Sequence, residues 1–163
     1  MKMENKEESK INTLKQKIMN GAHYHLVLNH LPIIIPIVSL LILIGGFAVK
    51  SEIVKRTAYC IFILGAITAF AAIATGEGAE HVVKQIEGIS KSLIHEHEEK
   101  AEVFALLSYA LGIGSIVALW SNWKKKSYAN YIALAILVFS LAVLYFGQQT
   151  GTTGGEIRHS EIR

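Results

Sequence analysis

The 163-residue chain is 52% hydrophobic and has a formal net charge of +3. This is more apolar than an ordinary soluble domain of this size, and it points to a membrane protein. The lysines lack interleaved aromatic residues, so we expect no nucleic-acid partner. The single cysteine, Cys60, excludes an intrachain disulfide.

Four long runs of the chain are almost without charged side chains. Each is close to the roughly 20 residues that a helix needs to cross the hydrocarbon core of a bilayer. Backbone polar groups in lipid must be hydrogen-bonded within the protein, so each run predicts a membrane-spanning helix. The predicted spans are residues 26–49, 57–75, 103–120 and 128–147.

The connections between these spans are unequal in length. Residues 50–56 and 121–127 form short loops, and such loops favour antiparallel neighbours. We therefore predict an all-α fold, an integral membrane four-helix bundle made of two antiparallel helical hairpins, over residues 23–147. Residues 1–22 form a polar segment with a short amphipathic helix along the membrane surface. Residues 148–163 form a flexible Gly/Thr-rich tail with a His/Glu motif that could close over a site.

Charge predicts which side of the membrane each segment faces. The two short loops contain Lys50, Lys55, Arg56 and the run 124–126, and basic loops are typically cytoplasmic. We expect a multi-pass protein of the plasma (inner) membrane, with both termini non-cytoplasmic. Its surroundings are the lipid bilayer, and a homo-oligomer or a partner in a membrane complex is compatible with this arrangement.

All seven histidines fall on the side away from the short loops, together with most of the carboxylates. Segments distant in sequence thus bring His and Glu to one mouth of the bundle. Local spacing supports shared helix faces, because residues three or four apart lie together. The proposed metal ligands are His30, Glu77, His81, His95, Glu99 and His159. The alternative ligands, or residues that orient a ligand, are Glu80, His97, Glu102 and Glu156.

Simpler interpretations exist for several of these residues. The run "HEHEEK" is typical of a solvated helix, and a single Glu-x-x-His such as Glu156–His159 is common by chance. His23 and His25 are expected at the membrane interface, with Tyr24 as an aromatic anchor. These interpretations do not account for His30, which lies inside the first predicted span.

The stretch "LNHLPIIIP" places His30 inside the first span beside Pro32 and Pro36. An ionisable residue within a span is a functional candidate. Neither proline can donate a backbone hydrogen bond, so the first turns should be kinked. A break of this kind is tolerated where it faces protein or water. We therefore expect these residues to form the floor of a polar pocket.

Four short motifs resemble a known family. They are His30 with Pro32, "TGEGAE" at the end of the second span, a histidine before the third, and "TGGEIRH" after the fourth. Together they resemble the domain of unknown function 2231, a family of small four-helix bacterial membrane proteins. The resemblance implies the fold and the membrane location, and it implies no reaction.

The predicted function is that of an integral membrane metalloprotein with a His/carboxylate site at the non-cytoplasmic mouth. Imidazole and carboxylate ligands without thiolate suit Fe, Zn or Mn, with redox or hydrolytic chemistry. The first alternative is a single-haem b-type cytochrome whose ligands are His30 with His97 or His81. The second alternative is a non-enzymatic membrane subunit of a larger complex.

Overall fold

The computed structural model describes residues 2–159, with side chains for residues 10–157 and 159. Within these residues the chain forms helices and no strand. The helices are α1 (Lys2–Leu28), α2 (Leu31–Ala48), α3 (Glu52–Val83), α4 (Lys91–Trp123) and α5 (Ala129–Arg158). Four helical segments of the described chain are long and apolar enough to cross a membrane, the first of them combining α1 from Lys10 with α2. The all-helical fold is confirmed, and the four segments qualify as membrane spans by their length and composition.

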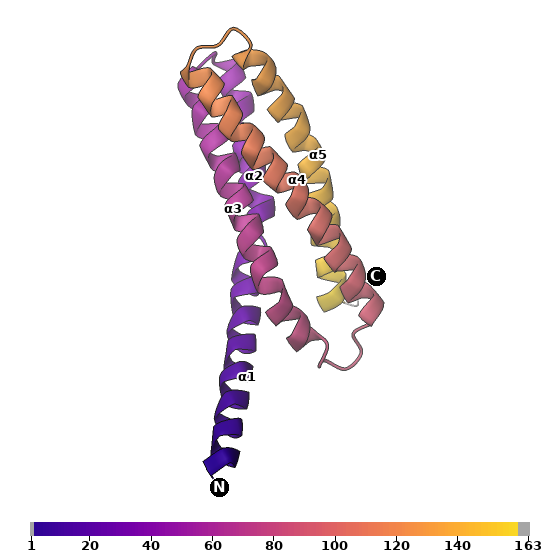
Figure 1. Cartoon of the computed structure of the whole chain (residues 1–163). Helices are drawn as coiled ribbons and strands as arrows, with labels where there is room; N and C mark the ends of the chain where they lie inside the picture. Colours follow the sequence, from indigo (N-terminus) through magenta and orange to yellow (C-terminus); the bar gives the residue numbers. More distant parts are fainter. Residues whose placement is uncertain (1, 160–163) are drawn as a thin grey trace.

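The helices pack into a long bundle with two distinct ends (Figure 1). Helix α2 packs against α3 and α5, α3 against α4, α4 against α5, and α1 against α3. The loops 49–51 and 124–128 lie together at one end, which we call the short-loop end. The loop 84–90 and both termini lie toward the opposite end, which we call the long-loop end.

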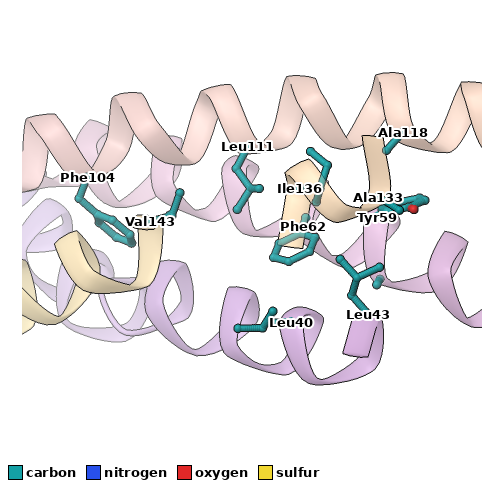
Figure 2. Close-up of a cluster of buried hydrophobic side chains, with 11 residues drawn as sticks. Leu40, Leu43, Tyr59, Phe62, Phe104, Leu111, Ala118, Ala133, Ile136 and Val143 are labelled. Carbon is teal, nitrogen blue, oxygen red and sulfur yellow. The ribbon is translucent and has the colours of Figure 1, made fainter. Parts of the chain in front are cut away.

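The core of the bundle is made from side chains of α2, α3, α4 and α5. Figure 2 shows Leu43, Tyr59, Phe62, Leu111 and Val143 pointing into this core, and all five are almost fully buried. Many large apolar side chains instead face outward. The exposed set includes Leu41, Phe70, Leu106 and Leu141. An apolar outer surface is what contact with a lipid bilayer requires.

Each of α3, α4 and α5 extends beyond the span predicted from apolar residues. Helix α3 continues to Val83 and α4 begins at Lys91, so most of the predicted segment between the second and third spans is helical. Helix α5 continues through the Gly/Thr-rich stretch to Arg158, so the predicted flexible tail is wrong over residues 148–158. Thr150 and Thr153 fit this helix because their hydroxyls donate to carbonyls of the preceding turn. Residues 160–163 of the predicted tail lie outside the described residues.

Helix α1 is longer than the short amphipathic helix predicted for the N-terminal segment. It continues roughly in line with α2 and extends past the rest of the bundle (Figure 1), so an orientation along the membrane surface is not confirmed. Helix α1 crosses α3 where two glycines meet. A Cβ added to Gly78 would lie 2.9 Å from the Cα of Gly21. The absence of side chains at this crossing allows the two backbones to touch.

Both short loops end a helix in the same way. Lys50 and Lys125 each have a φ of 51°, in the left-handed region that favours glycine. In each loop the next residue donates its N–H to a carbonyl five residues back, Ser51 to Gly46 and Lys126 to Ser121, both at 3.0 Å. This is the Schellman arrangement, with lysine at the position where glycine is usual.

Candidate functional site

The expected break at the start of the first span is present, but His30 lies on the surface. Helix α1 ends at Leu28 and α2 begins at Leu31, and the His30 side chain is exposed. Pro32 and Pro36 are buried, and a Cβ on Gly65 would lie 3.2 Å from Cγ of Pro36. The prolines therefore pack α2 against α3. The prediction that these residues floor a pocket around His30 does not fit an exposed ring.

The other predicted ligands are distributed over the long-loop end and do not form one cluster. Exposed side chains belong to Glu77, His81, His95, Glu99, Glu102 and His159. Half-buried side chains belong to Glu80, His97 and Glu156. Within the part of the chain that the structure describes, no three His, Cys, Asp or Glu side chains are placed to hold one metal ion.

Several of the acidic residues make surface ion pairs. Glu80 on α3 pairs with Lys84, which directly follows that helix, and lies close to Glu98 on α4. On α4, His95 Nε2 is 3.3 Å from Glu99 Oε1. The hydrogen bond with Glu80 raises the pKa of Lys84 above its ordinary value, so this pair stays charged at neutral pH. Exposed pairs of this kind contribute little to stability, and here they line the ends of α3 and α4.

His25 occupies a more enclosed position than its predicted place at the interface. Its ring is half-buried and packs from α1 onto α3. Nδ1 is 3.0 Å from the carbonyl oxygen of Ala72 and 3.3 Å from Oγ1 of Thr75. A Cβ on Gly76 would lie 3.9 Å from Cε1 of the ring. His25 is therefore held by a carbonyl, a threonine and a glycine of the neighbouring helix.

His97 is held in the same way on the other side of the bundle. Its half-buried ring packs from α4 onto α5, with Nδ1 3.2 Å from Oγ1 of Thr153. The ring also has a backbone hydrogen bond with Thr150. A Cβ on Gly154 would lie 3.0 Å from Cε1, closer than ordinary van der Waals contact. Gly154 thus makes room for the imidazole.

The two histidine environments repeat one pattern along two different helices. In each, the ring is hydrogen-bonded to the backbone of one residue. A threonine that also contacts the ring follows three residues later, and a glycine comes directly after the threonine. The matching positions are 72, 75 and 76 on α3 and 150, 153 and 154 on α5. The two rings are also close enough to interact electrostatically. We call His25 and His97 the histidine pair.

The hydrogen bonds determine which ring nitrogen remains available. A carbonyl oxygen only accepts, so Nδ1 of His25 carries the proton that it donates to Ala72. The hydroxyls of Thr75 and Thr153 donate to carbonyls of their own helices, so their oxygens accept from the histidines. In a neutral imidazole with a protonated Nδ1, Nε2 keeps its lone pair. His25 thus has one nitrogen oriented by the protein and one suited to bind a metal, and His97 has the same arrangement when its Nδ1 carries the proton.

His97 was among the predicted alternative ligands, whereas His25 was assigned to the interface. A signal for His25 is present in the sequence. Gly21, Ala22 and His25 fall on one helix face, and small residues on a face indicate close contact with another helix. The dipeptide Thr-Gly also occurs at both 75–76 and 153–154, inside two of the motifs that suggested the family resemblance.

The chain matches no protein-family model, no curated protein and no solved structure. The resemblance to the domain of unknown function 2231 therefore stays a prediction.

Proposed function

We propose that the protein is a membrane protein that binds a single haem of b type through His25 and His97. The observation that supports this proposal is the matched environment of the histidine pair, in which both Nδ1 atoms lie within hydrogen-bonding distance of groups on the neighbouring helix. With Nδ1 protonated, both Nε2 atoms keep a lone pair. Metal-binding histidines usually donate their other nitrogen to a carbonyl or a similar acceptor. Both rings have this arrangement.

The number of available ligands favours haem over a mononuclear His/carboxylate site. Zinc and non-haem iron sites need about three protein ligands or more. No such group is placed together among the described residues. A haem brings four nitrogen ligands of its own and needs only one or two from the protein. Two imidazoles from different helices meet that need, and the ligand pair becomes His25 with His97 instead of His30 with His97.

Haem in such a site supplies one-electron transfer. The residues of the chain hold the ligand rings in place: Thr75 and Thr153 accept from Nδ1, and Gly154 gives the His97 ring its space. With the basic short loops in the cytoplasm, the histidine pair lies toward the non-cytoplasmic end. A single haem there would exchange electrons with partners on that side of the membrane.

Absorption spectroscopy of the purified protein tests this proposal. We expect a strong Soret band and sharp bands on reduction, both lost in His25→Ala and in His97→Ala. The control is His95→Ala, because His95 lies on the same helix as His97 and is exposed. A spectrum that survives both ligand variants, or one that His95→Ala also abolishes, would contradict the assignment to this pair.

The same preparation separates the competing functions. A Fe, Zn or Mn site built from exposed residues such as His81, Glu99 and His159 would give about one or two metal ions per chain without a Soret band. Elemental analysis measures that content. Colourless, metal-free protein that copurifies with larger subunits would instead support a docking role in a membrane complex.

A further inference from the structure

A cavity of about 520 Å³ is lined by residues at the short-loop end of the bundle. It is lined by residues of α2, α3, α5 and the first short loop. These are Phe47, Lys50, Glu52, Lys55, Asn130, Tyr131 and Leu134. The cavity therefore combines two lysines and one carboxylate with aromatic and aliphatic walls.

Lys55 is a cation held almost out of solvent at the wall of this cavity. The residue is only 3% exposed, and its Nζ donates to Oδ1 of Asn130 at 2.8 Å and pairs with Oε1 of Glu52 at 2.6 Å. Its stem packs beside Gly46, where an added Cβ would lie 2.7 Å from Cγ of Lys55. A lysine ammonium has three N–H donors, so one donor remains after these two contacts.

Lys50 adds a second cation, at the cost of backbone strain. Its left-handed φ of 51° is tolerated better by glycine than by any residue with a side chain. Among the described residues, no carboxylate pairs with Lys50, because Glu52 is engaged by Lys55 and Asn122. Strained residues often lie where a side chain has a function. The strained residue here is Lys50, a cation that lines the cavity.

The surroundings of the cavity identify the kind of anion that it fits. The predicted loops 50–56 and 121–127 contain six lysines and arginines and one carboxylate. Phe47 and Leu134 supply apolar walls, and Tyr131 is exposed at the end of an apolar helix. This combination places positive charge at the level where membrane-spanning helices leave the hydrocarbon, beside a surface that faces acyl chains.

We propose that this cavity binds the headgroup of an anionic phospholipid. The phosphate contacts the ammonium group of Lys50, with the buried charge of Lys55 behind it, and an acyl chain lies along Leu134 and Tyr131. A soluble anion would use the charges alone, whereas a phospholipid also covers the apolar walls. This site is independent of the proposed haem and does not require it.

Native mass spectrometry of the full chain in neutral detergent tests the proposal, with phosphatidylglycerol and phosphatidylcholine of identical acyl chains as probes. We expect phosphatidylglycerol to bind more tightly to the wild type. Lys50→Gly should weaken its binding about fivefold, the effect of one lysine near an anionic lipid surface. Because glycine also relieves the left-handed strain, this variant should fold at least as well as the wild type.

Lys125→Gly is the matched control, since Lys125 has the same φ and charge and does not line the cavity. We expect it to leave phosphatidylglycerol binding unchanged. Equal weakening by Lys125→Gly would mean a diffuse basic surface and would overturn the proposal. Equal binding of the two lipids would overturn it as well. Full displacement of the lipid by inorganic phosphate would assign the cavity to a soluble anion instead.

Discussion

The two ends of the bundle treat their polar side chains in different ways. At the short-loop end, Lys55 is paired with Glu52 and Asn130, and Arg56 donates to Asn122. At the long-loop end, His25 and His97 each have one nitrogen engaged and the other with a lone pair. The first arrangement satisfies nearly all of its donors and acceptors inside the protein. At the long-loop end the imidazole rings are held through Nδ1, and Nε2 is left without a hydrogen bond in either ring's described contacts.

This difference separates the contacts of the buried Lys55, which stabilise the fold, from the histidine pair, which is suited to bind haem. A buried cation with its partners adds rigidity and is destabilising to break. An oriented imidazole contributes little to folding and gains its value when a metal binds it. Changes at the histidine pair should therefore remove haem binding and leave stability, and removal of Lys55 should lower stability and leave haem binding.

The strongest test of this division is Gly154→Leu at the long-loop end. The new side chain would meet the His97 ring, which must then leave its position. We expect haem affinity to fall about a hundredfold, the upper range for disturbed support of a ligand, while the helical content stays unchanged. Haem titration and circular dichroism measure the two effects. Gly151→Leu is the control on the same helix, because a Cβ there meets only Ile33 at an ordinary 3.4 Å.

The opposite test is Lys55→Ala at the short-loop end. It removes a buried stem and two charge-assisted hydrogen bonds, and Glu52 is exposed enough to regain water. We expect a loss of about 2 kcal/mol in the free energy of unfolding, with haem affinity unchanged. Reversible unfolding in mixed detergent measures the first quantity. Lys124→Ala, at an exposed position, should change it by less than about 0.5 kcal/mol. A parallel loss of haem would show that the two ends are not separable.

The smallest expected effect comes from Thr75→Val, which sharpens the comparison within the histidine pair. Valine keeps the shape of threonine and removes the oxygen that accepts from His25, while the carbonyl of Ala72 remains. We expect haem affinity to fall about tenfold. Thr68→Val is the matched control, because the Thr68 hydroxyl donates only to Gly65 of its own helix. Similar affinities for the two variants would argue against a positioning role for Thr75.

The sequence was sufficient to predict the long apolar helices, because hydrophobic length alone determines whether a segment can cross a bilayer. Their ends were harder to predict. Polar residues such as Glu80 and His97 continue α3 and α4 beyond the apolar runs, and polar side chains are no obstacle to a helix outside the hydrocarbon. Thr150 and Thr153 likewise extend α5 through a stretch whose composition suggested flexibility.

The candidate site was predicted in part, at the correct end of the bundle but with different residues. His30 drew attention because an ionisable residue within a span is costly, yet an exposed position at a helix break avoids that cost. His25 was passed over because Tyr24 beside it is typical of an aromatic anchor at the membrane interface, which placed His25 there as well. Which side of α1 meets α3 depends on the contact between Gly21 and Gly78, and a pairing of distant glycines cannot be read from one sequence.

Helix α1 connects the proposed site to the part of the chain that projects beyond the bundle. At 27 residues the helix is about 40 Å long, and it holds His25 near one end and the N-terminal residues at the other. Gly21 lies between His25 and the outer part of this helix. It is the position where α1 contacts Gly78 of α3 directly through the backbone. The projecting part of α1 (Figure 1) and His25 therefore belong to one continuous helix, so a molecule bound to the former would contact the same element that carries the latter.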